Sequence, residues 1–291
     1  MKHILSLIRL HQWVKNLFIF IPAFFAERIL DSDLFFRLIG GFVAFSLVAS
    51  SIYILNDYVD VEKDRQHPKK RFRPLASGAI QAPTALVLLG ICFVAGMSLG
   101  YLTDPTLVWV MLGYFGMNVA YSFRLKQVPI LDISLISIGF LLRVLAGGVV
   151  AEVPISKWLV ILTFLLALLL ALAKRRNEFL IARSGKDIRK GIEGYNLEFT
   201  TSAMVFTASI TVVAYIMYTT SEEVIKRIGN DYLYLSSIFV ILGILRYLQL
   251  ALVYEKTGSP TRILLKDVFI QLVLLAWLGT FALMLYSPLF A

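Results

Sequence analysis

Long apolar runs separated by short polar segments recur along the whole chain. Nine of these runs are long enough to cross a membrane as helices. The predicted spans are residues 14–30, 34–56, 83–102, 106–122, 130–150, 157–173, 200–219, 231–253 and 267–287. Residues 2–12 come before them and have the pattern of a short interfacial helix. The pattern therefore predicts an all-α, polytopic membrane protein.

Composition supports this prediction and limits the classes of partner. The chain is 58% hydrophobic, far above an average soluble domain. Its net charge of +9 could suggest nucleic-acid binding, but most of its 28 Lys and Arg residues lie before the first span or in loops that follow even-numbered spans. The positive-inside rule places the N-terminus and those loops in the cytoplasm and the C-terminus outside. The positive charge is therefore interpreted as a signal that sets the orientation of the chain in the membrane. No nucleic-acid partner is expected.

Residues 1–291 are predicted to form a single transmembrane domain. Two long cytoplasmic loops, 57–82 and 174–199, each follow an apolar span, and we expect them to cap one active site. The single cysteine, Cys92, lies inside a span and excludes disulfides within the chain. Small-residue pairs predict close helix packing in lipid, namely Gly96 with Gly100, Gly113 with Gly116, and Gly147 with Gly148.

A cluster of carboxylates stands where the second span meets water. Asp57, Asp60 and Asp64 are spaced i, i+3 and i+7, which on one continuous helix places them on one face. Such close like charges repel each other unless a hard divalent cation lies between them. Oxygen ligands of this kind suit Mg²⁺ holding a phosphate-bearing substrate. The spacing therefore predicts a metal and phosphate site.

The segment directly after the carboxylates is basic. Its cations include Arg65, Lys70, Arg71 and Arg73. Arginine offers a forked donor that matches phosphate oxygens, and lysine acts as a point charge. An acidic metal cluster followed at once by a basic run is the pairing expected for a diphosphate, with the metal on one edge and the cations on the other.

The two segments together resemble a known motif. Asn56-Asp57-x-x-Asp60-x-x-x-Asp64, followed by Arg71-x-Arg73-Pro-Leu-x-Ser-Gly, is similar to the first motif of the UbiA superfamily of intramembrane prenyltransferases. The nine predicted spans extend the resemblance over essentially the whole chain. It implies a UbiA-like helical bundle in which Asp57, Asp60 and Asp64 are catalytic and bind Mg²⁺, with Asn56 as a further ligand.

The second motif of that superfamily does not match. A second aspartate-rich run is generally found after the sixth span, but here the sequence is Lys174-Arg175-Arg176-Asn177-Glu178. These residues predict room for an additional phosphate rather than a second metal cluster. Together with Arg9-Leu-His-Gln12-Trp13-Val-Lys15-Asn16 at the start and Tyr121-Ser122-x-x-Leu125-Lys126 with Asp132 after the fourth span, they resemble the decaprenyl-phosphate phosphoribosyltransferase branch of the superfamily.

That branch implies transfer of 5-phosphoribose from 5-phosphoribosyl diphosphate to a polyprenyl phosphate. Lys15 and Asn16 are expected to hold the acceptor phosphate, and Lys126, Lys174 and Arg175 other phosphate groups. For Arg143, inside the fifth span, a site-lining role and a structural ion pair both remain open. The full set of predicted substrate contacts is Lys15, Asn16, Asn56, Arg65, Lys70, Arg71, Arg73, Asn118, Tyr121, Lys126, Arg143, Lys174, Arg175, Glu178 and Tyr195.

No Ser-His-Asp or Cys-His arrangement can be assembled from the sequence. A phosphate acceptor is already ionised near neutral pH, so direct displacement at ribose C1 needs no general base. The expected location is the cytoplasmic membrane, among membrane lipids, with the site facing the cytoplasm, and a homo-oligomer is left open. Two alternatives remain: prenyl transfer to an aromatic acceptor such as 4-hydroxybenzoate, and a non-catalytic lipid-phosphate carrier.

Overall fold

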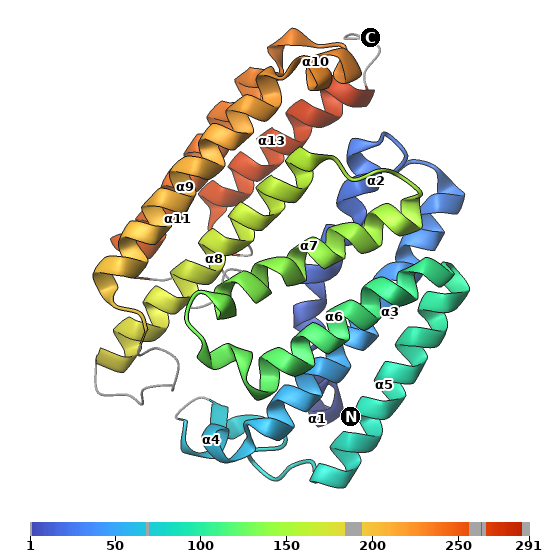
Figure 1. Cartoon of the computed structure of the whole chain (residues 1–291), viewed down its shortest axis with the longest axis vertical. Coiled ribbons are helices and arrows are strands. Elements are labelled where there is room, and N and C mark those ends of the chain that lie inside the picture. Colours follow the sequence, from blue (N-terminus) through green and yellow to red (C-terminus); the bar gives the residue numbers. More distant parts are fainter. Residues whose placement is uncertain (1, 68–69, 184–193, 256–262, 264–265, 287–291) are drawn as a thin grey trace. The chain divides into compact units, whose positions relative to one another are not determined.

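The computed structural model describes residues 2–67, 70–183, 194–255, 263 and 266–286, and every regular element within these ranges is a helix (Figure 1). The chain divides into two compact units, Met1–Ile155 and Ser156–Ala291. The all-α prediction is confirmed. The prediction that both units act as one domain stays a prediction.

The first unit is built around one long helix. It contains α1 (Lys2–Leu7), η1 (Leu10–Phe20), α2 (Ile21–Phe25), α3 (Ser32–Val59), α4 (Val61–Gln66), η2 (Lys70–Phe72), α5 (Ala82–Thr103), α6 (Pro105–Phe123), η3 (Leu125–Gln127) and α7 (Leu131–Ala151). Helix α3 packs along α5 and also contacts η1, α6 and α7 (Figure 1). Asp31 caps its first turn by accepting from the Asp33 and Leu34 amides at 3.1 and 3.3 Å. The buried core of this unit includes Leu38, Phe45, Val48, Met111 and Val150.

The first predicted span, 14–30, is not one continuous α-helix. Residues Leu10–Phe20 form a 3₁₀-helix, and α2 adds five residues after it, with Pro22 in its first turn. At about 2.0 Å per residue, η1 alone extends about 22 Å, and α2 adds about 7.5 Å. The segment therefore approaches the thickness of the hydrocarbon core, about 30 Å. The stretched geometry lets these sixteen residues cover a span that an α-helix of the same length would not.

The glycine predictions are partly confirmed. A Cβ at Gly147 would lie 2.0 Å from the carbonyl oxygen of Ile19, so the backbones of α7 and η1 touch there. A Cβ at Gly96 would lie 2.8 Å from the Ala44 carbonyl oxygen, which explains the close approach of α5 to α3. The prediction is wrong for Gly113 and Gly116, because a Cβ at either one would meet no described atom within 4 Å.

The second unit contains α8 (Lys157–Arg183), α9 (Leu197–Thr220), α10 (Glu222–Ile228), η4 (Asp231–Ser236), α11 (Ser237–Leu252) and α13 (Val268–Tyr286). Helix α9 packs against α8 and α11, and α11 packs against α13. Asn196 caps α9 by accepting from the Phe199 amide at 2.6 Å. The predicted loop 174–199 is shorter than expected, because residues 174–183 continue α8.

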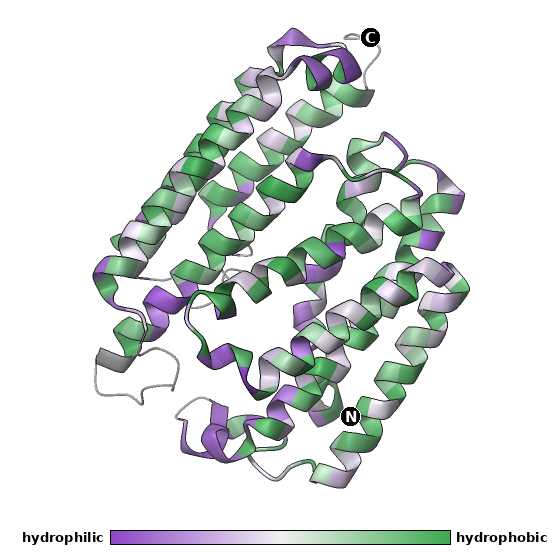
Figure 2. Cartoon of the chain, viewed as in Figure 1, coloured by the Kyte–Doolittle hydropathy of each residue, from purple (hydrophilic) through white to green (hydrophobic). Residues whose placement is uncertain are grey.

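Eight helices among the described residues are long and apolar enough to cross a membrane. They correspond to eight of the nine predicted spans, and the η1–α2 segment corresponds to the remaining one. Helices α5 and α13 are mostly hydrophobic along their length, whereas α4 and α10 are mostly hydrophilic (Figure 2). The chain is accordingly described as a multi-pass membrane protein.

Candidate active site

The carboxylate motif does not lie on one helix. Helix α3 ends at Val59, Asp60 leaves helical geometry (φ −96°, ψ 7°), and α4 begins at Val61. The predicted single helical face is therefore wrong. The chain bends where the apolar span ends, in a run of β-branched and acidic residues that favours a helix end over continuation. Asp57 consequently belongs to α3 and Asp64 to α4.

Arg73 joins the two separated carboxylates. Its Nη1 donates to Asp57 Oδ1 at 3.0 Å and to Asp64 Oδ2 at 2.5 Å. Both carboxylates are buried, with 2% and 3% of their surface exposed. Buried charges are stable only when paired, and one guanidinium here serves both. The bend at Asp60 thus still brings Asp57 and Asp64 to one point.

Two further cations complete the cluster. The Nζ of Lys126, on η3, donates to Asp60 Oδ1 at 2.7 Å, and this lysine is also buried. Arg9 donates through Nη2 to Asp57 Oδ1 and stacks over the Tyr53 ring at 5.1 Å. We define the acidic cluster as Asp57, Asp60 and Asp64 with their partners Arg9, Arg73 and Lys126.

Arg9 opens one of the motifs behind the family resemblance, but it was not predicted as a site residue. It lies in the left-handed region (φ 52°) between α1 and η1, 48 residues before its partner Asp57. No local pattern could have identified its partner.

Asn56 directly precedes Asp57 in the chain. Its side-chain Oδ1 is buried and makes no hydrogen bond with any residue that the structure describes. A buried carbonyl oxygen without a donor is costly, and a cation or a water would satisfy it. Within the described residues, no three His, Cys, Asp or Glu side chains are grouped as metal ligands. The metal-ligand role of the three aspartates stays a prediction.

Arg143 is held inside the first unit by neutral groups. It donates to Asn16 Oδ1 at 2.7 Å, to the Gly139 carbonyl at 2.6 Å and to the Tyr114 hydroxyl at 3.0 Å. Its guanidinium also lies over the Phe45 ring at 5.3 Å. An arginine at mid-membrane costs about 2.5–3.5 kcal/mol on insertion scales. Hydrogen bonds to a charged group contribute about 1.5–3 kcal/mol each, so this network offsets the cost.

Other predicted contacts of the first unit have local partners. Arg65 pairs with Glu62 at 2.7 Å on the exposed side of α4, and Arg71 stacks on the Phe72 ring at 4.9 Å. The Asn118 side-chain amide donates to the Tyr114 carbonyl of its own helix at 2.8 Å. The remaining two are Lys70, on η2, whose backbone amide donates to His67 Nδ1 at 3.2 Å, and Tyr121, on α6. Their predicted roles toward substrate stay predictions.

The predicted residues of the second unit form their own cluster. Glu178 pairs with Arg175 and, at 3.9 Å, with Lys174, all on consecutive turns of α8. Tyr195 is buried, and its ring packs against Phe199 with centroids 6.0 Å apart. Glu178 is thus neutralised by two cations of its own helix. Its predicted part in substrate binding stays a prediction.

Arg246, also in the second unit, is a contrast to Arg143. Its guanidinium donates to both carboxylate oxygens of Asp267, at 3.3 and 2.9 Å. These hydrogen bonds lower the pKa of the Asp267 carboxyl below its usual value. Arg246 is therefore a paired, structural arginine, whereas Arg143 has no acidic partner among the described residues.

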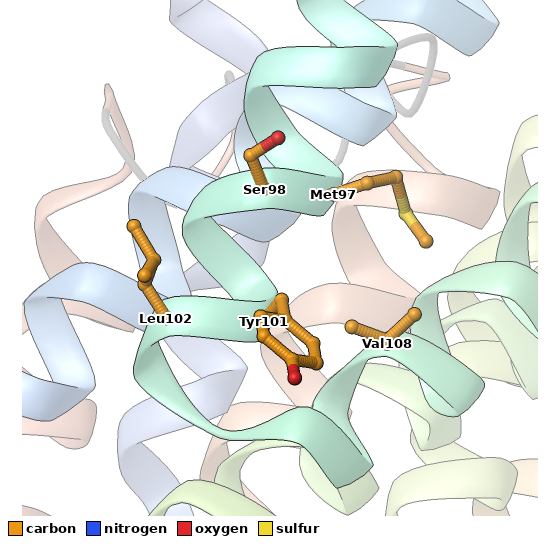
Figure 3. A pocket seen from close by; sticks show the side chains of 5 residues that line it. All are labelled: Met97, Ser98, Tyr101, Leu102 and Val108. Carbon is orange, nitrogen blue, oxygen red and sulfur yellow. The ribbon is translucent and has the colours of Figure 1, made fainter.

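A shallow pocket opens between α5 and α6 (Figure 3). It is lined by Met97, Ser98, Tyr101, Leu102 and Val108. These side chains are neutral and mostly apolar, and none belongs to the acidic cluster. Among the described residues, the pocket therefore contains no charged side chain that could bind a phosphate.

Comparison with known proteins identifies the family of the chain. The profile described as the UbiA prenyltransferase family matches residues 16–273. A decaprenyl-phosphate phosphoribosyltransferase of Mycolicibacterium smegmatis is 34% identical, over 97% of this chain and 92% of the relative. The protein of that name from Mycobacterium tuberculosis is 33% identical, over 95% of this chain and 92% of its own.

Among solved structures, a UbiA homolog from Archaeoglobus fulgidus bound to DMAPP and Mg²⁺ has the same fold. Its TM-score is 0.73 at 17% identity, covering 98% of this chain and 99% of that one. At this level of identity the likeness establishes the fold alone.

Proposed function

Because the chain belongs to the UbiA prenyltransferase family, we propose that it transfers 5-phosphoribose from 5-phosphoribosyl diphosphate to a polyprenyl phosphate, releasing diphosphate. The similarity to decaprenyl-phosphate phosphoribosyltransferases over nearly the whole chain supports this choice of substrates. A decaprenyl-like acceptor is the corresponding expectation for the lipid.

The main structural support for the proposal is that acidic and basic side chains pair with each other in one cluster. Asp57 and Asp64 share Arg73, and Asp60 holds Lys126. A diphosphate needs both kinds of group, because carboxylates can hold its divalent counterion and cations can bind its oxygens directly. The acidic cluster brings both kinds of group together.

The donor set fits Mg²⁺, the metal bound in the Archaeoglobus fulgidus homolog. All candidate ligands are hard oxygens, and the buried Asn56 Oδ1 has a lone pair that no described donor uses. Asp57, Asp60, Asp64 and Asn56 would hold the ion. When bound, a divalent cation would neutralise the charge that develops on the departing diphosphate.

In the proposed reaction, an oxygen of the acceptor phosphate bonds to ribose C1 while the bond from C1 to the diphosphate oxygen breaks. No proton changes place, since the acceptor is ionised before it reacts. Arg73, Arg9 and Lys126 would turn from the carboxylates to the oxygens of the leaving diphosphate. Preorganised donors of this kind stabilise charge that appears only in the transition state.

The proposed function also has a consequence for where the protein lies in the cell. We place the enzyme in the cytoplasmic membrane with the acidic cluster facing the cytoplasm, since most basic residues lie in the loops on that side. Loop 57–82 would cap the site, and the corresponding role of segment 174–199 stays a prediction. Residues 184–193 of that segment lie outside the described residues.

Turnover by the purified full-length chain in detergent tests the proposal. With 5-phosphoribosyl diphosphate, decaprenyl phosphate and Mg²⁺, we expect a lipid-linked phosphoribose and stoichiometric diphosphate, detected by mass spectrometry. Addition of EDTA should abolish both products, and excess Mg²⁺ should restore them.

Two outcomes would contradict this expectation. Prenylated product from a polyprenyl diphosphate and 4-hydroxybenzoate, with no lipid-linked phosphoribose, would make the chain a prenyltransferase. Binding of decaprenyl phosphate without any turnover, in either reaction, would favour a lipid-phosphate carrier.

A further inference from the structure

Two cationic residues of the first unit, Lys15 on η1 and Arg143 on α7, lie on packed segments without an acidic partner among the described residues. Arg143 donates to Asn16, the residue after Lys15, and Gly147, one turn further along α7, meets the Ile19 carbonyl on η1. Arg143 donates only to neutral acceptors, and Lys15 forms no hydrogen bond or ion pair with the described residues. Like charges repel strongly where water is scarce, and an anion between them would remove that cost.

The same segment, η1, begins at the acidic cluster. Arg9, directly before η1, donates to Asp57, and Lys15 lies six residues further along the chain. The Asn16 amide that holds Arg143 donates to Ser46, eleven residues before Asp57 on α3. An anion held by Lys15 and Arg143 would therefore lie on the membrane side of the carboxylates.

Asn16 has a different role from the one predicted from the sequence. It is almost fully buried, its Oδ1 accepts from Arg143, and its Nδ2 donates to Ser46 Oγ at 2.7 Å. Both ends of the amide are thus engaged within the protein. Asn16 fixes the Arg143 guanidinium against α3 and is a positioning residue.

We propose that Lys15 and Arg143 bind the phosphate of the lipid acceptor, with Asn16 holding Arg143 in place. A phosphate monoester carries between one and two negative charges near neutral pH, which matches two cations. Arg143 lies inside the spanning helix α7, and so the ligand approaches from the lipid rather than from the cytoplasm. This inference rests on the proposed function and names the groups that recognise its acceptor.

Binding without turnover tests the site independently of catalysis. The probe is decaprenyl phosphate titrated into the full-length protein in detergent, with decaprenol and inorganic phosphate as comparison ligands. Lys15→Met removes one cation, and Asn16→Asp keeps the shape of the side chain but places a carboxylate against Arg143. Lys157→Met, at the exposed start of α8, is the matched control.

We expect Lys15→Met and Asn16→Asp each to weaken decaprenyl phosphate binding about tenfold or more, which corresponds to about 1.4 kcal/mol. Binding by Lys157→Met should equal that of the unmodified protein. Decaprenol and inorganic phosphate should bind far more weakly than decaprenyl phosphate. In turnover assays, the two site variants should raise KM for the lipid and leave KM for 5-phosphoribosyl diphosphate unchanged.

Unchanged lipid binding in both site variants, with thermal unfolding showing that they are folded, would overturn the inference. So would equal affinity for inorganic phosphate, which would make the site a general anion site. If lipid binding falls as expected but no phosphoribosyl transfer is found, the site stands and the proposed function fails. If transfer proceeds and the variants bind normally, the function stands and the site fails.

Discussion

Replacing Asp60 with Asn is expected to lower turnover about a thousandfold, equivalent to about 4 kcal/mol of transition-state stabilisation. The substitution keeps the size of the side chain but removes the charge that faces Lys126 at 2.7 Å. An amide oxygen is also a weaker ligand than a carboxylate for a hard cation. The measurement is the initial rate of lipid-linked phosphoribose formation at saturating substrates and Mg²⁺.

Glu62→Gln is the matched control for this variant. Glu62 lies two residues further along, on the exposed side of α4, and pairs only with the exposed Arg65 among the described residues. Surface ion pairs contribute about 0–1 kcal/mol, so its rate should stay close to that of the unmodified protein. Full activity of Asp60→Asn, or an equal loss in both variants, would contradict a specific role for Asp60.

Gly147→Ala is expected to destabilise the protein by about 3 kcal/mol, toward the upper end of overpacking costs. The new methyl group would lie 2.0 Å from the Ile19 carbonyl oxygen, and a backbone atom cannot move aside as a flexible side chain can. Helix α7 and η1 would have to separate. Thermal unfolding in detergent should show a clearly lower Tm.

Gly113→Ala provides the comparison for this second prediction. Gly113 is also in a spanning helix, α6, and a Cβ there would meet no described atom within 4 Å. The change should be neutral or slightly stabilising, because alanine is the better helix former. A similar loss of stability in both variants would mean that the close contact at Gly147 is not the cause.

Much of the fold could be predicted from hydrophobic periodicity, because helices in lipid must be long, apolar and internally hydrogen-bonded. The η1–α2 segment could not, since the same apolar run fits an α-helix or a stretched 3₁₀-helix. Its conformation depends on tertiary contacts, such as Trp13 Nε1 donating to Ser50 Oγ at 3.1 Å and the approach to Gly147. These contacts are not visible in local sequence.

The candidate site was likewise only partly predictable from the sequence. The acidic residues could be found from their spacing and from the family resemblance, but their partners could not. Arg9 and Lys126 reach Asp57 and Asp60 from positions 48 and 66 residues away in the chain. The bend at Asp60 was also unforeseen, because the i, i+3, i+7 spacing fits a continuous helix equally well. Long-range ion pairs and chain bends follow from the packed structure.

The ion pairs of the acidic cluster have a consequence for the order in which ligands bind. Asp57, Asp60 and Asp64 are already neutralised by cations of the chain, so a divalent ion must displace an ammonium or guanidinium group to reach them. The diphosphate offers the displaced groups new partners. Thermodynamic linkage then requires each ligand to raise the affinity for the other by the same factor. Calorimetric titration should therefore find weak Mg²⁺ binding alone and much tighter binding once the donor is present.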